Sequence, residues 1–163
     1  MDSRKLIFLD VDGVLATSRQ ILELDDAGLV PLDASCVQNL AEVVRDTGAE
    51  IVVSSAWRND GQLYQHLLSS LEVLGGRDLA MAVVGTTPTL HQGRGFEIVQ
   101  WMAEQQVPES TRLVIFEDSL QHHHNIEAAG LGAALVKTVL DPNLEEGLTK
   151  GAAEQAMRLL GAK

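Results

Sequence analysis

The sequence is poor in cysteine, aromatic residues and positive charge. Its one cysteine, Cys36, has no partner for an internal disulfide, and no cysteine pair has zinc-site spacing. Aromatic residues make up 4% of the 163 residues, and 12 Lys and Arg face 23 Asp and Glu, a net charge of −11. Because basic residues supply most affinity for nucleic acids and anionic membranes, this balance disfavours both. We expect a cytoplasmic protein for which nucleic acid is a disfavoured but not an excluded partner.

Long apolar runs are also missing. The apolar residues Leu6 to Leu9 are too few for the core of a signal peptide. No run approaches the roughly 18 residues of a membrane span, so we expect a soluble protein without a membrane partner. The apolar content of 45% excludes a disordered acidic chain, because such chains lack the apolar surface that offsets the entropy cost of ordering. At roughly 150 residues per domain, residues 1–163 are predicted to form a single domain.

Short apolar runs alternate with segments of helical period. This pattern predicts an α/β fold of the three-layer, Rossmann-like type, in which helices cover both faces of a parallel five-stranded sheet. The expected strands are 6–9, 51–53, 81–84, 113–116 and 133–136. The expected helices are 33–47, 62–74, 96–105, 120–129 and 144–159, the first with Cys36 on its apolar stripe as a small buried side chain. Residues 13–31 lack clean periodicity, and both a hairpin and a flap remain open for them.

Acidic and hydroxyl residues follow three of the predicted strands. In sequence order they are Asp10, Asp12, Ser54, Ser55, Glu117 and Asp118. Ligands of open parallel sheets bind beyond the carboxyl ends of the strands, although a helix cap or a turn explains each residue equally well by itself. If the first and fourth strands are neighbours, four carboxylates converge and repel one another without a cation. Such an oxygen-rich cluster suits Mg²⁺.

Three segments resemble motifs of the haloacid dehalogenase-like (HAD) hydrolase superfamily. Residues 8–15, with the sequence FLDVDGVL, look like its first motif, and 51–54 resemble the second. Residues 115–119, together with 128–130, resemble the fourth motif in the form of the β-phosphoglucomutase-like subgroup. Arg94 is the best match to the basic residue of the third motif. Segments 54–58 and 87–98 are also similar to the HAD domain of RNA-repair proteins.

The resemblance implies a Mg²⁺-dependent phosphatase that forms an aspartyl phosphate. Asp10 would attack phosphorus, and Asp12 would protonate the leaving oxygen and later activate water. The side chains of Asp10 and Asp118 and the backbone carbonyl of Asp12 would bind Mg²⁺. Glu117 would be either a further metal ligand or a residue just outside the metal's ligand set.

The remaining site residues would hold the phosphoryl group. Ser54, the amide of Ser55 and Arg94 fill this role in the resemblance. Arg58 is a second candidate guanidinium, and a solvated surface position explains it equally well. Residues 93–95 also match the first three positions of the GxGxxG dinucleotide-binding motif. They do not predict a dinucleotide site, because the sixth position, residue 98, is Ile and no strand directly precedes the segment.

The intervals 13–50 and 56–93 are too short to hold the cap domain of many HAD members. A capless site implies a large phosphorylated substrate or closure by a homo-oligomer, and it counts against a mutase, which must exclude water. The consecutive residues His122, His123 and His124 point in different directions on a helix and cannot readily chelate one ion.

Other functions remain open. A nucleic-acid end phosphatase of the RNA-repair type is the alternative enzyme. A receiver-like phosphoacceptor module shares the sheet and the acids, but its acceptor aspartate follows the third strand, and residues 83–87 contain no carboxylate. A catalytically idle binding domain is the third possibility.

Overall fold

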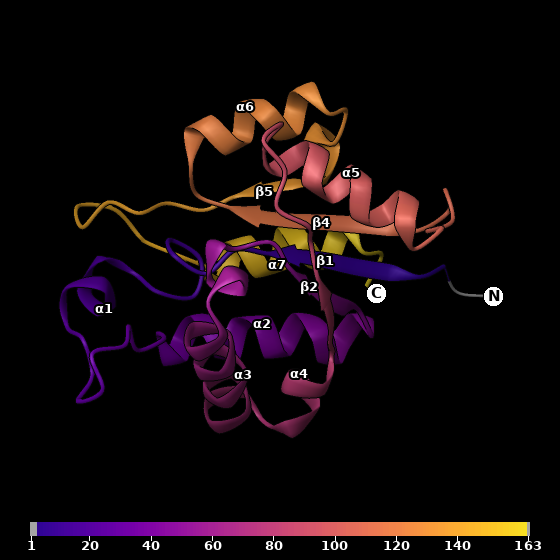
Figure 1. The fold of residues 1–163 in the computed structure, drawn as a ribbon. Helices are drawn as coiled ribbons and strands as arrows, with labels where there is room; N and C mark the ends of the chain where they lie inside the picture. The colour runs from indigo at the N-terminus through magenta and orange to yellow at the C-terminus, as the bar shows by residue number, and fades with distance from the viewer. Residues whose placement is uncertain (1–2, 163) are drawn as a thin grey trace.

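The structure is a computed structural model that describes residues 3–162, and its centre is one parallel sheet of five strands (Figure 1). The strands are β1 (Lys5–Leu9), β2 (Glu50–Val53), β3 (Val83–Thr86), β4 (Arg112–Glu117) and β5 (Leu135–Lys137), in the spatial order β3-β2-β1-β4-β5. Residue Leu9 at the end of β1 pairs with Phe116 of β4. The two strands that lead into the acidic residues are therefore neighbours, which is the condition for their convergence.

Helices cover both faces of the sheet and confirm the predicted three layers. One face carries α2 (Ala34–Thr47), α3 (Gly61–Gly75), α4 (Arg77–Met81) and α7 (Lys150–Leu159), and the other carries α5 (Arg94–Glu104) and α6 (Leu120–Ala128) (Figure 1). Side chains of β1 alternate between two apolar clusters: Ile7 and Leu9 join the larger one, and Leu6 and Phe8 the smaller. The central strand is thus buried on both sides, which fixes its register and the position of the residues that follow it.

Only short elements occupy the connections between these strands and helices within residues 3–162. They are α1 (Ser18–Leu22), the 3₁₀ helix η1 (Ala56–Asn59) and the 3₁₀ helix η2 (Gly132–Ala134). In the described part of the chain, neither the interval 13–50 nor the interval 56–93 contains a cap domain. Segment 13–31, left open between a hairpin and a flap, forms α1 and an irregular loop.

Several element boundaries differ from the sequence prediction. Met81 ends α4, so the third strand is 83–86 rather than 81–84. Helix α5 begins at Arg94, two residues before the predicted start. The last helix begins at Lys150 instead of 144, because the Thr149 side chain caps it by accepting a hydrogen bond from the amide of Ala152. Leu144, at the start of the predicted helix 144–159, is 60% exposed and lies in a loop.

Cys36 is buried in α2, as its place on the apolar stripe predicted. Burial, together with the nearby Asp33, raises the pKa of its thiol to about 12, so the thiolate is scarce at neutral pH. In the part of the chain that the structure describes, no helix combines the length and the apolar character needed to cross a membrane.

Candidate active site

The site lies at the carboxyl edge of the sheet, where the backbone ladder continues one residue beyond the strand ends. The additional bonds run from Asp10 N to Phe116 O (3.3 Å), Ser54 N to Leu9 O (2.9 Å), Thr87 N to Val53 O (3.0 Å) and Thr138 N to Glu117 O (3.1 Å). These bonds hold the first residue after β1, β2, β3 and β5 at a common level. Side chains far apart in the sequence are therefore brought to one edge.

A tight turn follows β1 and brings the loop against β4. Gly13 has a φ of 77°, in the left-handed region that favours glycine, and its carbonyl accepts a hydrogen bond from Thr138 Oγ1 at 2.7 Å. A Cβ atom on Gly13 would overlap the side chain of Asp118. The glycine of the first motif is therefore required for the loop to approach Asp118 this closely.

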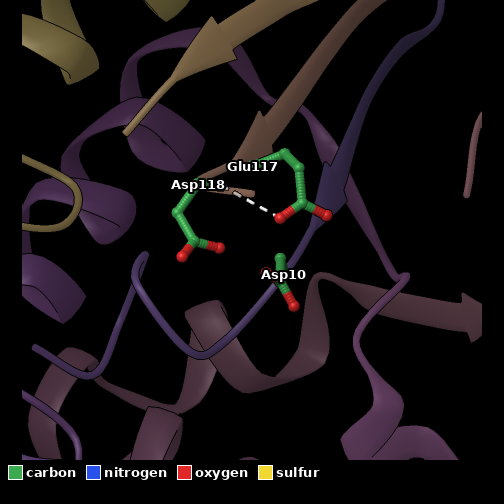
Figure 2. Close-up of side chains that lie close together, drawn as sticks. All are labelled: Asp10, Glu117 and Asp118. Atoms are coloured by element: carbon green, nitrogen blue, oxygen red, sulfur yellow. Dashed lines mark hydrogen bonds between the residues drawn. The ribbon is translucent and has the colours of Figure 1, made fainter. Parts of the chain in front are cut away.

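Three carboxylates gather beside this turn. Oxygens of Asp10, Glu117 and Asp118 all lie within 4.8 Å of one another around one small space (Figure 2). Burial, reinforced by the negative charge of Asp10, raises the pKa of Glu117 to about 9 and also raises the pKa of Asp118. The pKa of the Asp12 carboxyl is raised by the same two causes. Like charges this close disfavour ionisation, and a hard divalent cation such as Mg²⁺ relieves that cost through oxygen ligands.

Both carboxylate oxygens of Glu117 already have protein partners. Oε1 accepts a hydrogen bond from Arg94 Nη1 at 2.8 Å, and Oε2 accepts from the amides of Asp118 (3.0 Å) and Ser119 (3.3 Å). Every partner is a donor, and the residue is 1% exposed. Glu117 thus fixes the turn after β4 and holds the guanidinium of Arg94 next to the acidic cluster.

Arg94 is the first residue of α5 and points into the acidic cluster. Its Nη1 lies 3.6 Å from Asp10 Oδ1, and its Nε lies 3.7 Å from Glu97 Oε1 without a hydrogen bond. Helix α5 is placed by Asn125 of α6, whose Oδ1 accepts a hydrogen bond from Gly95 N at 2.6 Å. A Cβ on Gly95 would meet the α6 backbone at 2.6 Å, so this glycine permits close helix packing, and 93–95 needs no dinucleotide to explain it.

The side chain of Arg58 is buried, and all its nitrogens contact protein oxygens. The sequence predicted either a phosphate-binding guanidinium or a solvated surface residue at this position. The Arg58 side chain is 4% exposed and ties the turns after β2 and β3 together. The contacts of its nitrogens are Nε with Thr87 O (2.9 Å), Nη1 with Ser54 O (2.9 Å) and Ser55 O (2.6 Å), and Nη2 with Pro88 O (3.3 Å) and Glu97 Oε2 (3.1 Å). A guanidinium has five N–H donors, so no donor remains for a phosphate. Burial lowers the pKa of Arg58, while Glu97 opposes that shift.

Two buried hydroxyls beside Arg58 lack partners. Ser54 Oγ and Thr87 Oγ1 make no hydrogen bond in the described chain, although the residues are only 1% and 3% exposed. An unpaired buried hydroxyl costs free energy, so these two hydroxyls have unused hydrogen-bonding capacity at the carboxyl edge of the sheet. Ser55 differs, because its Oγ accepts a hydrogen bond from Trp57 N (3.2 Å) as the cap of η1.

Thr87 was missed by the sequence prediction. The third strand was predicted to end at residue 84, which left Thr87 in a loop rather than at a strand end. The sequence of residues 83–87, VVGTT, could have indicated it, because two strand-forming valines are followed by Gly85 and then by Thr86 and Thr87.

The three consecutive histidines have separate surroundings. His123 is buried, and its Nε2 lies 2.7 Å from Glu117 O in a hydrogen bond. His122 is half-buried, and burial together with Arg94 lowers its pKa, whereas His124 is exposed. Within residues 3–162, the candidate metal-binding group consists of Asp10, Glu117 and Asp118 and includes none of the three histidines.

Comparisons with known proteins bear on this arrangement. The sequence matches the family described as "HAD domain in Swiss Army Knife RNA repair proteins" over residues 6–153. The fold is similar to an uncharacterized protein from Corynebacterium glutamicum, with 18% identity, a TM-score of 0.50, and 98% of this chain and 96% of that one covered. A haloacid dehalogenase-like family hydrolase from Streptococcus pneumoniae is similar at 12% identity, with a TM-score of 0.50 and coverages of 96% and 91%. No curated protein is similar enough to match.

Proposed function

The chain belongs to the family of HAD domains found in Swiss Army Knife RNA repair proteins, and from this premise we propose that it is a Mg²⁺-dependent phosphomonoester phosphatase. Membership confirms the predicted HAD superfamily and supports a hydrolase. The observation that carries the finer proposal is the convergence of Asp10, Glu117 and Asp118 beside the buried Arg94. This arrangement supports Asp10 as a carboxylate nucleophile, Asp10 and Asp118 as metal ligands, and Arg94 as a cation at the same point.

In the proposed reaction, Asp10 attacks phosphorus and forms an aspartyl phosphate. The bond from phosphorus to the leaving oxygen breaks, its electron pair stays on that oxygen, and Asp12 supplies the proton. Asp12 then takes a proton from water, which attacks the aspartyl phosphate and releases Asp10 and inorganic phosphate. Arg94, 3.6 Å from Asp10, balances negative charge on the nucleophile and the transferring group.

Mg²⁺ would be held by the side chains of Asp10 and Asp118 and by the backbone carbonyl of Asp12. Glu117 supports the site from outside this ligand set, because both its oxygens are taken by Arg94 and backbone amides. When bound, the ion offsets the repulsion between the phosphate dianion and the carboxylates.

Phosphate oxygens would be bound by Ser54 Oγ, the amide of Ser55 and Arg94. We add Thr87 Oγ1 to this set, since it is the second buried hydroxyl without a partner. The sequence prediction placed Arg58 among the phosphate ligands; its occupied donors favour a different role, in which it holds the turns that carry Ser54 and Thr87.

The proposal is tested by the hydrolysis of an aryl phosphate by the purified chain. Turnover with Mg²⁺ and its loss with a chelator are expected. A long-lived phosphoprotein without turnover, after treatment with a small phosphodonor, would favour the receiver-like module instead. Absence of both Mg²⁺ binding and turnover would favour the idle binding domain.

The family description makes a phosphorylated RNA end the second candidate substrate. The loops around the site weigh against it: segments 13–33 and 138–149 carry seven acidic residues and one arginine. The two segments lie at the same edge of the sheet (Figure 1), and the amide of Ser18 donates to Glu146 Oε1 at 3.3 Å. Polyanions are repelled by such a rim. Parallel assays on oligonucleotide ends, phosphopeptides and phosphorylated metabolites distinguish the substrates.

Three further expectations belong to the same proposal. The chain would act in the cytoplasm as a single domain. Its open site would take a large substrate or be closed by a second copy of the chain. Measurement of molecular mass in solution, with and without a phosphate analogue, distinguishes the last two options.

A further inference from the structure

The carboxylate of Asp12 has one hydrogen-bond partner in the described chain, and that partner is Trp57. Nε1 of the indole donates to Asp12 Oδ2 at 3.4 Å. This distance is long for such a bond, as is common for catalytic contacts before the substrate binds. Asp12 is otherwise exposed, whereas Trp57 is 4% exposed. An exposed side chain is thus hydrogen-bonded to a buried one.

Two contacts hold Trp57, and a third fixes the histidine on which its ring stacks. Its amide donates to Ser55 Oγ at 3.2 Å, which fixes the start of η1 beside the phosphate-binding turn. Its ring stacks on His66 of α3, with ring centroids 6.0 Å apart and an interplanar angle of 28°. Nε2 of His66 forms a hydrogen bond with Val30 O at 2.7 Å, which ties the stack to the loop after α1. The indole therefore has little freedom to move away from Asp12.

We propose that Trp57 is the positioning residue for Asp12, an inference that rests on the proposed phosphatase function. An indole N–H can only donate, so it binds an unprotonated oxygen of Asp12 and leaves the proton on the other oxygen. During transfer, that proton moves to the leaving oxygen as the bond to phosphorus breaks. The indole hydrogen bond then stabilises the carboxylate that remains.

The second tryptophan provides a matched control. Trp101 of α5 is 6% exposed and packs edge-to-face on Phe8, with centroids 5.7 Å apart and an interplanar angle of 83°. It lies in the apolar cluster on the other face of the sheet. A Phe substitution at either tryptophan keeps an aromatic ring and removes the indole N–H, but only Trp57→Phe removes a donor to Asp12.

The kinetic test compares two esters with Mg²⁺ present. A p-nitrophenyl ester releases a stable anion and needs little help from a general acid, whereas an alkyl phosphate releases an alkoxide and needs a proton. Since general acid catalysis contributes about 10²–10⁴-fold, Trp57→Phe is expected to lower kcat/KM by about tenfold on the alkyl ester and by less than about threefold on the aryl ester. Trp101→Phe should leave the ratio of the kcat/KM values for the two esters unchanged. Equal losses on both esters in Trp57→Phe would overturn the proposal.

A second measurement does not depend on activity. In ¹⁵N-labelled protein the two tryptophans give two indole N–H signals, assigned with the Phe variants. Asp12→Ala removes the acceptor, so the Trp57 signal should shift while the Trp101 signal stays in place. An unmoved Trp57 signal overturns the proposal, even if Trp57→Phe fails to fold. If the wild type hydrolyses neither ester, the phosphatase function fails, and the indole shift still decides whether Trp57 holds Asp12.

Discussion

The two ends of the sheet both carry ion pairs, and the pairs differ in burial rather than in length. At the amino end, Arg4 Nε lies 2.8 Å from Glu50 Oε1, with side chains 36% and 38% exposed. At the carboxyl end, Arg58 Nη2 lies 3.1 Å from Glu97 Oε2, with side chains 4% and 7% exposed. Exposed pairs contribute about 0–1 kcal/mol, whereas burying each ion costs several kcal/mol that the pairing only partly offsets. Stability alone does not explain why the carboxyl end keeps buried charges.

Buried hydroxyls show a related contrast. Thr47, just before β2 at the amino end, donates to Val43 O at 2.6 Å and accepts from Ala49 N at 3.2 Å. The hydroxyls of Ser54 and Thr87 at the carboxyl end have no hydrogen-bond partner within residues 3–162. Thr111, before β4, also lacks one, but that residue is only half-buried. The carboxyl end thus combines buried charge with unused hydrogen-bonding capacity, and both fit a site that is completed by a metal and a phosphate.

The largest expected effect comes from removing the nucleophile. Asp10→Asn should lower phosphatase turnover by at least about 10³-fold, because an amide cannot form the aspartyl phosphate. The fold should survive, since the substitution keeps the shape of the side chain and lowers the repulsion from Glu117 and Asp118. Turnover of an aryl phosphate and thermal unfolding measure the two effects. Glu50→Gln, at the other end of the sheet, is the control and should keep full activity; wild-type turnover in Asp10→Asn would refute the assignment.

The next largest effect tests Arg58 as a brace. Arg58→Ala removes the nearer cation from the buried Glu97, which keeps the 3.7 Å contact with Arg94. It also strips donors from the carbonyls of Ser54 and Thr87. Breaking a buried pair from one side costs about 3–5 kcal/mol of unfolding free energy. Urea denaturation measures the loss, and Arg58→Ala with Glu97→Gln should recover part of it. A loss below about 1 kcal/mol would mean that the carboxyl end behaves like the amino end.

The sequence predicted the architecture because burial leaves a strong pattern. β1 is apolar at every position from Leu6 to Leu9, and the order of strands and helices followed from such runs. The acids at the strand ends were predicted for the same reason, since a strand end fixes where the next residue lies. Arg58 and Thr87 could not be placed, because their roles depend on contacts between turns about 30 residues apart. The role of Trp57 could not be predicted either, since nothing in its local sequence predicts an indole N–H near Asp12.

The pH dependence of stability gives an intermediate effect. The pKa of Glu117 rises from its ordinary value of 4.5 to about 9 on folding, so the folded state binds more protons than the unfolded state between those values. Stability without metal should therefore fall as pH rises through this window. Between about pH 6 and about pH 9, Tm should drop by several degrees without Mg²⁺ and by less with it, because the ion favours the charged carboxylates. Glu117→Gln should flatten the metal-free slope; an equal slope in wild type and variant would contradict the assignment to Glu117.

The smallest effect is expected at the amino end and completes the comparison. Arg4→Ala removes an ion pair as short as any in the site, at 2.8 Å, but both partners keep contact with water. Water and salt screen the charge that remains on Glu50, so the unfolding free energy should fall by less than about 1 kcal/mol, and the effect should shrink at high ionic strength. Urea denaturation at low and high salt measures it, with Arg58→Ala under the same conditions as the reference. A salt-independent loss as large as that of Arg58→Ala would mean that length, rather than burial, sets the strength of these pairs.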